Sequence, residues 1–274
     1  MRSKFLVLIS VISLCALTTP AQGEVILPTM KLIHTINGSI SPKSVRSSGD
    51  GVVSAHNMMY RHSVTVYDAD SLQLISTIPD RVKLSDFGID GYSGTHRGAP
   101  VEGAYSPDGK YLYVTNYAMY GKGFNREGTD VCKPADRYDR SFLYRISTAT
   151  WEIDAAYRVG VVPKVVAVSP DNKYVLVSNW CSYDLSVLSI ETQKVIKTIS
   201  VPKGPVGVAT ASKLHRVFIS NVDGQSISVI DGINQKLIRN IIVKGSPVGL
   251  ALTPDEKILY VADWVSDRIF AFET

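Results

Sequence analysis

Apolar and polar residues alternate in short runs along most of this chain, and the runs recur as a unit. Residues 163–201 form one complete unit, PKVVAVSPDNKYVLVSNWCSYDLSVLSIETQKVIKTISV. Period-two runs separated by Ser, Pro, Asp and Asn predict four short antiparallel strands in each unit. Related units begin at Pro100, Pro205 and Pro247, and both steps from Pro163 through Pro205 to Pro247 are 42 residues. A four-stranded repeat of about 40 residues indicates a β-propeller, in which each unit forms one blade.

Five such units account for the chain, with blades that start near residues 42, 100, 163, 205 and 247. The proline at a unit's start suits the first residue of an inner strand, because its fixed φ and missing N–H are tolerated there. The first two units carry polar excursions at residues 79–99 and 118–140, and the last unit ends after three predicted strands.

The fourth strand of the last blade is expected to come from the start of the chain. Residues 30–36, MKLIHTI, match the fourth strands KVIKTISV and KLIRNIIV of the internal units. A blade completed in this way closes the ring and leaves no free sheet edge at that point. The predicted fold class is therefore all-β, a β-propeller of five four-stranded blades closed by the N-terminal strand.

The second unit carries a recognisable signature, Tyr113-Val114-Thr115-Asn116, after the turn Ser-Pro-Asp-Gly-Lys at residues 106–110. Looser copies end at Asn179, Asn221 and Asp263. These residues resemble the YVTN-type β-propeller repeat family, and the resemblance covers nearly the whole chain after residue 23. It implies an exported bacterial propeller protein, a class whose members usually have seven blades. This chain departs from that pattern: it is a small propeller, it has lost blades, or two chains complete each other.

The first residues have the pattern of a secretory signal peptide. Arg2 and Lys4 precede an apolar stretch at residues 5–17, and Ala-Gln-Gly at residues 21–23 provides a small-residue cleavage site. We expect residues 1–23 to be removed and residues 24–274 to form a single domain in the periplasm or outside the cell. A lipoprotein signal at Cys15 is the alternative, although the preceding leucine fits it poorly.

Charge and cysteine content narrow the function classes. Without Arg2 and Lys4 the remaining 251 residues hold 27 basic and 25 acidic side chains, a net charge near +2. This balance does not by itself indicate a nucleic-acid or membrane-surface partner, and a nucleic acid is not expected. No further segment is apolar enough to span a membrane. Cys132 and Cys181 fall in corresponding loops of neighbouring blades, so we expect a disulfide between them.

A repeated Asn or Asp ends the second strand of four units, 16 residues after the starting proline. Since these strand ends surround one mouth of the ring, the residues there hydrogen-bond the following loop or contact a ligand. Aromatic rings beside amides and acids suit sugars, peptides or stacked bases. The candidate ligand-binding residues on this face are His56, Asn57, Tyr60, Arg61, His62, Asn116, Tyr117, Tyr120, Asn179, Trp180, Asn221, Asp223, Asp263 and Trp264.

Two further sets of residues bear on chemistry. His56 and His62 flank a turn and suit a divalent metal, but no carboxylate at matching spacing completes a ligand set. We therefore predict no cofactor, with a divalent metal at these histidines as the alternative. The inner strands are expected to place Lys43, Arg46, Glu102 and Lys164 near the axis of the ring. This mostly basic channel suits a small anion or bound water, or is a plain solvated pore.

The sequence thus predicts a non-catalytic, monomeric binding or scaffold protein whose partner is a small molecule, a glycan or a protein. It contains no CxxCH, HExxH or Walker motif and no convincing nucleophile–base pair. A metal-assisted lactonase- or lyase-like enzyme is the first alternative, by analogy with catalytic propellers. Binding of single-stranded nucleic acid is the second, and the near-neutral charge weakens it.

Overall fold

The computed structural model describes residues 30–133 and 137–274, so the predicted signal peptide lies outside the described residues. Residues 36–274 form one compact unit, and residues 30–35 belong to a separate one. The strands of the larger unit form four sheets of four antiparallel strands and a fifth sheet of three, so the fold is all-β and β-propeller-like.

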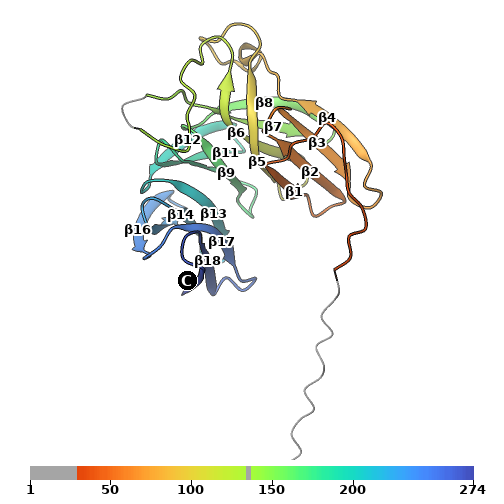
Figure 1. The fold of residues 1–274 in the computed structure, drawn as a ribbon. Coiled ribbons are helices and arrows are strands. Elements are labelled where there is room, and N and C mark those ends of the chain that lie inside the picture. The colour runs from red at the N-terminus through yellow and green to blue at the C-terminus, as the bar shows by residue number, and fades with distance from the viewer. Residues whose placement is uncertain (1–29, 134–136) are drawn as a thin grey trace, which may run out of the picture. The chain divides into compact units, whose positions relative to one another are not determined.

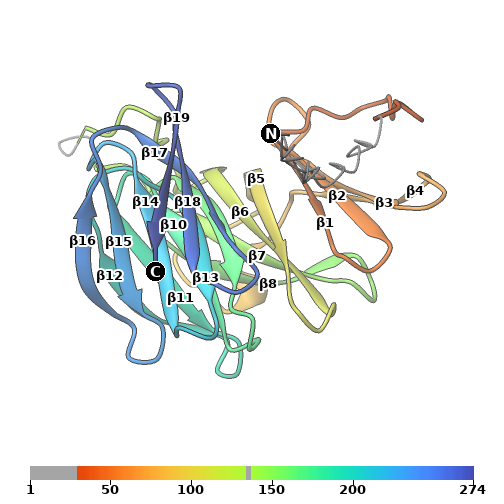
Figure 2. The same cartoon turned by 90° about the horizontal axis from the view of Figure 1, so that it is seen from below.

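The sheets follow one another in chain order, from β1–β4 in orange to β17–β19 in blue (Figures 1 and 2). The first sheet contains β1 (Ser44–Ser47), β2 (Val52–Asn57), β3 (Ser63–Asp68) and β4 (Leu74–Pro79). The second contains β5 (Arg97–Tyr105), β6 (Tyr111–Tyr120), β7 (Phe142–Ser147) and β8 (Glu152–Arg158). The third contains β9 (Pro163–Val168), β10 (Tyr174–Asn179), β11 (Asp184–Ser189) and β12 (Lys194–Ser200).

The remaining two sheets repeat this order. The fourth contains β13 (Pro205–Ala211), β14 (Arg216–Asn221), β15 (Ser226–Asp231) and β16 (Lys236–Ile242), and the fifth contains β17 (Pro247–Leu252), β18 (Ile258–Asp263) and β19 (Arg268–Glu273). Proline begins β9, β13 and β17 as predicted, whereas β5 begins three residues before Pro100, where the pairing register shifts. The first strand of each sheet contacts the first strand of the next, so β1, β5, β9, β13 and β17 are the inner strands.

The closing strand differs from the expectation. Residues 30–36 form no strand, the side chains of Met30, Leu32 and Ile33 are 101, 81 and 80 % exposed, and the fifth sheet consists of β17–β19 alone. A strand is defined by its ladder of hydrogen bonds, and a partner for residues 30–36 is distant in sequence, so the local pattern does not form the pairing by itself.

Apolar seams between neighbouring sheets form the core. Val64 and Val66 of β3 pack on Leu112 and Val114 of β6, and the same arrangement recurs at the next three boundaries. The side chains buried in the third seam are Leu176, Leu185, Val187, Ile199, Val201, Val217, Ile219 and Ile230. Alternate residues of a strand point to opposite faces of its sheet. A sheet with a neighbour on each side therefore packs one set of side chains against the preceding sheet and the other set against the following sheet.

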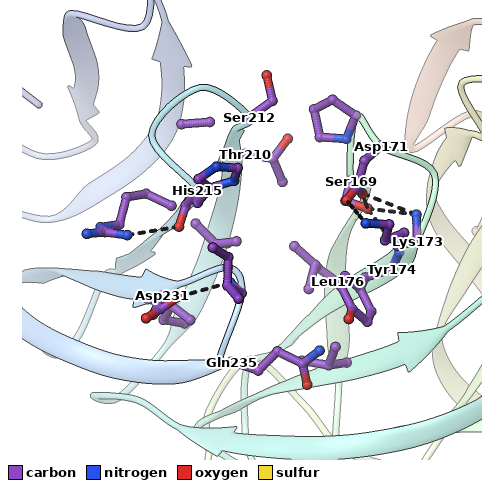
Figure 3. Close-up of a pocket in the computed structure, with 18 of the residues that line it drawn as sticks. Ser169, Asp171, Lys173, Tyr174, Leu176, Thr210, Ser212, His215, Asp231 and Gln235 are labelled. Carbon is purple, nitrogen blue, oxygen red and sulfur yellow. Dashed lines mark hydrogen bonds and ion pairs between the residues drawn. The ribbon is translucent and has the colours of Figure 1, made fainter.

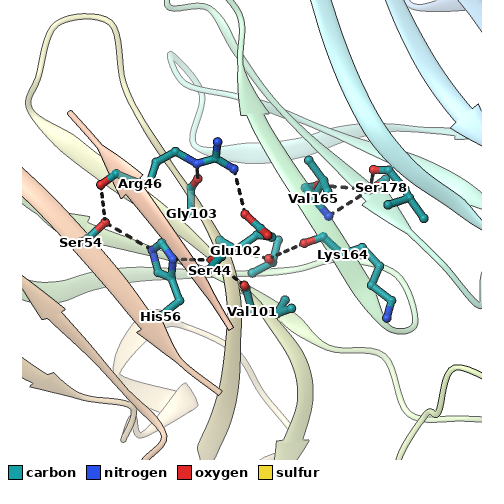
Figure 4. Close-up of polar contacts among 12 residues, drawn as sticks. Ser44, Arg46, Ser54, His56, Val101, Glu102, Gly103, Lys164, Val165 and Ser178 are labelled. Atoms are coloured by element: carbon teal, nitrogen blue, oxygen red, sulfur yellow. Dashed lines mark hydrogen bonds and ion pairs between the residues drawn. The ribbon is translucent and has the colours of Figure 1, made fainter. Parts of the chain in front are cut away.

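A hydroxyl group in each seam donates a hydrogen bond to the inner strand of the following sheet. The donors and acceptors are Thr115 Oγ1 and Lys164 O (3.0 Å), Ser178 Oγ and Val206 O (2.7 Å), and Ser220 Oγ and Val248 O (2.6 Å). His56 occupies the matching position in the first sheet, and Ser44 supplies the hydroxyl there, 2.8 Å from the carbonyl oxygen of Val101 (Figure 4). These buried bonds fix the position of each sheet against the next.

The repeated Asn or Asp at the end of the second strand ties the blade together internally. Asn179 Nδ2 donates to Asp184 Oδ1 (2.6 Å) and Ser186 Oγ (2.9 Å), while its Oδ1 accepts from the Gly160 backbone N–H (3.0 Å). Members of the set are at most 8 % exposed, namely Asn57, Asn116, Asn179, Asn221 and Asp263. These side chains are therefore structural, which was one of the two interpretations of the repeat.

Replacing Asn179 by alanine is expected to lower the free energy of unfolding by about 1–3 kcal/mol, because buried partners lose their hydrogen bonds. Chemical denaturation monitored by circular dichroism measures the loss. Asp223→Ala is the control, since Asp223 is exposed at the same end of the strands and its removal should change stability by less than about 0.5 kcal/mol. Equal stability of the two variants would contradict a structural role for Asn179.

Candidate ligand-binding surface

The two excursions pack against each other beside the second sheet. In residues 79–99 a short 3-10 helix, η1 (Leu84–Phe87), is followed by Tyr92, whose ring stacks on Phe124 at 4.8 Å between centroids. His96 Nε2 lies 3.0 Å from the carbonyl oxygen of Lys122. The irregular segments are thus held by aromatic contacts and hydrogen bonds rather than by the repeat pattern.

Residues 118–133 and 137–140 also cross to the third sheet. Trp180 Nε1 donates to the carbonyl oxygen of Asp130 at 3.1 Å, and the expected disulfide joins Cys132 to Cys181. Cys132 and Cys181 pack with Trp180 and Tyr117 around a small apolar cluster that contains Val162 and Val222. The disulfide and the hydrogen bond from Trp180 therefore both attach this excursion to the third sheet.

Lys164 lies at the centre of the first polar cluster. Its ammonium pairs with Asp130 and lies over the rings of Tyr117 and Trp180, at 4.7 and 5.2 Å from their centroids. The Tyr117 hydroxyl donates to Asp130 at 3.2 Å. Although partial burial favours the neutral carboxyl, the Lys164 ammonium lowers the pKa of Asp130, and burial together with the Asp130 charge raises the pKa of Tyr117 well above its usual range.

Tyr120 lies at the centre of a second polar cluster. Its hydroxyl donates to Glu127 at 2.6 Å, the Arg97 guanidinium lies 5.4 Å from its ring centroid, and His62 meets the ring edge-on. The His62 ring nitrogen Nδ1 lies 2.7 Å from the carbonyl oxygen of Gly98. Burial lowers the pKa of His62 and raises that of Tyr120, so the uncharged form of each is favoured.

Tyr117 and Tyr120 point to opposite faces of β6, but the two clusters lie close enough to interact, since in addition to burial the charges of Glu127 and Tyr120 contribute to raising the pKa of Tyr117. We call them together the excursion surface, made of His62, Arg97, Tyr117, Tyr120, Glu127, Asp130, Lys164 and Trp180. Five of these residues were predicted to lie on this face or in the channel. Arg97, Glu127 and Asp130 were missed, because excursions have no repeat template that assigns their residues to a face.

The predicted channel is less basic than the sequence implied. Arg46 donates to Glu102 at 2.8 Å and to the Gly103 carbonyl at 2.9 Å (Figure 4). The charge of Lys164 is paired with that of Asp130. Burial raises the pKa of Glu102, and the Arg46 charge opposes that shift. Lys43 is exposed, and Arg46 lines a cavity of about 620 Å³ among the inner strands.

His56 is a buried structural side chain. Ser44 Oγ lies 2.8 Å from His56 Nδ1 and donates its only proton to Val101 O. His56 Nδ1–H is therefore the donor to the serine oxygen. A Cβ atom on Gly103 would lie 2.2 Å from His56 Nε2, so only glycine leaves room for the imidazole. Burial and, to a lesser extent, the Arg46 charge lower the pKa of His56 to about 4.

Neutral His56 makes the protein sensitive to acid. In the folded state His56 is protonated only near pH 4, whereas in the unfolded state it is protonated near pH 6.5. The free energy of unfolding should therefore fall as the pH drops from 6.5 to 4. The loss is on the order of 3 kcal/mol for a shift of this size. Denaturant titrations of the wild type and His56→Gln at pH 7 and pH 4 measure it, and the variant should lose less. A pH dependence unchanged in His56→Gln would contradict the assignment.

Other predicted site residues are scattered. Tyr60 and Trp264 are 87 and 73 % exposed, and Arg61 and Asp223 are exposed as well, but within the described part of the chain they form no hydrogen bond, ion pair or ring contact with the excursion surface. Trp180 is 8 % exposed and supports the excursion from beneath. In residues 30–133 and 137–274, no three His, Cys, Asp or Glu side chains are grouped closely enough to hold a metal ion.

Comparison with known proteins bears on the fold alone. No model of a known protein family matches this sequence, and a search of curated proteins finds no match. A protein of unknown function from Desulfotomaculum acetoxidans DSM 771 superimposes with a TM-score of 0.65 at 11 % identity over 87 % of this chain and 67 % of its own. Hydrazine synthase from Kuenenia stuttgartiensis gives 0.64 at 18 % identity over 90 and 67 %.

These similarities place the chain among all-β, β-propeller-like proteins. The resemblance to YVTN-type repeats stays a prediction that rests on the residues that carry it. Among the described residues we find no helix with the length and apolarity that a membrane crossing requires.

Proposed function

We propose that this protein is a non-catalytic binding protein of the periplasm or extracellular space, and that the excursion surface holds its ligand. The observation that carries this proposal is the anchoring of residues 118–133 and 137–140 by a disulfide, by Trp180 and by the Lys164–Asp130 ion pair. Long ordered loops on a rigid scaffold are typically functional. A disulfide is also compatible with an oxidising, exported location.

The charges of the excursion surface favour an uncharged ligand. Lys164 is paired with Asp130, and Arg97 and Glu127, which both contact Tyr120, contribute opposite charges. The surface thus presents tyrosine rings, carboxylate acceptors and cationic donors without a net charge. Ring faces beside paired hydrogen-bonding groups suit a carbohydrate, whereas a nucleic acid requires a net positive surface.

Glycan-array screening of the mature protein, followed by calorimetry with the best ligand, tests this function. Tyr120→Ala should weaken binding by about tenfold or more, since a stacking platform is removed. Trp264→Ala is the control, because Trp264 is an even more exposed aromatic residue outside the excursion surface, and this variant should bind normally. Affinity should change little with salt because no counterions are released. Absence of any bound carbohydrate, or loss of binding in the control alone, would refute the proposal.

We also propose that residues 31–36 pair with β19 in the mature protein and complete a fifth four-stranded blade. Lys31-Leu32-Ile33 and Ile36 repeat residues of β16, in which Lys236 lies opposite Asp231. In the fifth sheet β19 corresponds to β15, and residues 31–36 correspond to residues 236–241 of β16. The same register then places Lys31 opposite Glu273 and His34 opposite Ala271. Pairing of this kind protects the free edge of β19.

Cysteines introduced as His34→Cys and Ala271→Cys are expected to form a second disulfide, because opposed residues have Cα atoms about 5 Å apart. Peptide mapping by mass spectrometry under non-reducing conditions detects it. Lys31→Cys with Ala271→Cys is the control, displaced by about 10 Å along the strand. Failure of the first pair, or equal cross-linking of both, would exclude the register.

A further inference from the structure

A pocket of about 400 Å³ opens between the third and fourth sheets, at the strand ends opposite to the excursion surface (Figure 3). Its base is aliphatic and belongs to the seam between these sheets: Leu176, Leu185, Val187, Val217 and Ile230. The turns between β9 and β10 and between β13 and β14 form its mouth. Its volume lies in the range of about 300–1,000 Å³ that is usual for small-molecule sites.

The pocket exists where the repeat has leucine in place of an aromatic side chain. The residue three positions before the repeated Asn faces the following sheet, and it is Tyr113, Leu176 and Phe218 in the second, third and fourth sheets. Tyr113 and Phe218 are 1 and 5 % exposed, so their rings fill their seams. Leucine is shorter than either ring, and Leu176 lines the pocket.

The other seams confirm this difference in filling. The first contains Tyr105 and Trp151, the second Tyr111, Tyr113 and Tyr157, and the fourth Phe218, Phe270 and Phe272. The third seam contains one aromatic residue, Tyr174, which is only partly buried at the pocket mouth. Protein interiors rarely contain empty space of this size. The space that an aromatic side chain fills in the other seams is therefore available to a ligand here.

Charges at the mouth have partners within the protein. Lys173 Nζ lies 3.5 Å from Asp171 Oδ2, and Arg216 donates to the backbone oxygens of Leu214 and His215 at 3.2 and 3.1 Å. Asp231 accepts from backbone N–H groups of its own turn. The mouth therefore offers little free charge to an ionic ligand.

Uncharged hydrogen-bonding groups remain at the mouth. Figure 3 shows His215 and Thr210 on one side of the opening and Tyr174 and Leu176 on the other. The His215 side chain is exposed, and among the described residues its imidazole makes no hydrogen bond or ion pair with a neighbour. Imidazole both donates and accepts, so it suits a single polar group on an otherwise apolar molecule.

We propose that this pocket binds a small, uncharged aromatic molecule whose ring occupies the space beside Leu176 and whose polar group meets His215. The aliphatic base excludes charge, because an unpaired ion there loses its hydration without compensation. The missing aromatic side chain sets the shape of the ligand. This site is separate from the excursion surface and does not depend on the function proposed for it.

Indole is a suitable probe, since it has a flat apolar body and one N–H donor. Calorimetry on the full mature protein is expected to show one indole per chain, and thermal denaturation should show stabilisation of the bound form. Leu176→Phe introduces the residue that the next sheet has at this position, and it should weaken indole binding by about tenfold or more while leaving the fold intact. Tyr260→Phe, at the same repeat position in the fifth sheet, is the matched control and should bind normally.

His215→Asn gives an independent result if Leu176→Phe fails to fold. Asn tolerates the positive φ of 50° at this position and is too short to reach the ligand, so indole affinity should fall several-fold with unchanged stability. Indole-3-acetate should bind more weakly than indole. Absence of indole binding to the folded wild type, unchanged affinity in folded Leu176→Phe, unchanged affinity in His215→Asn, or tighter binding of the acetate would each overturn the proposal.

Discussion

Face-to-face packing of neighbouring sheets holds this protein together, and one buried hydrogen bond fixes each of four packed boundaries. Burial of apolar side chains in the seams stabilises the fold, but the hydrophobic effect has no preferred direction. It therefore does not by itself set the position of one sheet on the next. The hydroxyl of Thr115, Ser178 or Ser220 supplies that direction by donating to a carbonyl of the next inner strand. His56 and Ser44 together perform the same task at the first boundary.

This constraint explains why several residues that look functional in the sequence are structural. The repeated asparagines end strands on the face where the sequence suggested a ligand, yet they are buried and hydrogen-bond backbone and side-chain groups around them. His56 has the residue type of a metal ligand, but Gly103 and Ser44 enclose it. Residues that hold neighbouring sheets together lie along the inner strands and at the strand ends, where a ligand is also expected, so position alone does not distinguish the two roles.

Departures from the repeat are the better guide to function. One excursion follows the first unit and the other interrupts the second, and together they bring Arg97, Glu127 and Asp130 beside residues of the regular strands. Leu176 stands where the second, fourth and fifth sheets have an aromatic side chain, and it lines a pocket. In both places the other sheets show which residues the repeat has when their role is packing alone. A residue or loop that departs from them therefore indicates a candidate site.

The pattern of residues was enough to predict the order of the strands, the repeat length, the prolines that begin β9, β13 and β17, and the pairing of Cys132 with Cys181, because each depends on periodicity or on the correspondence between units. The tertiary structure alone decided which polar residues are buried, since that depends on contacts between neighbouring sheets. It also decided the geometry of the excursions, whose aromatic and ionic contacts follow no period. The fourth strand of the last blade shows the same limit, because a strand pattern predicts extended backbone but its partner is a long-range contact.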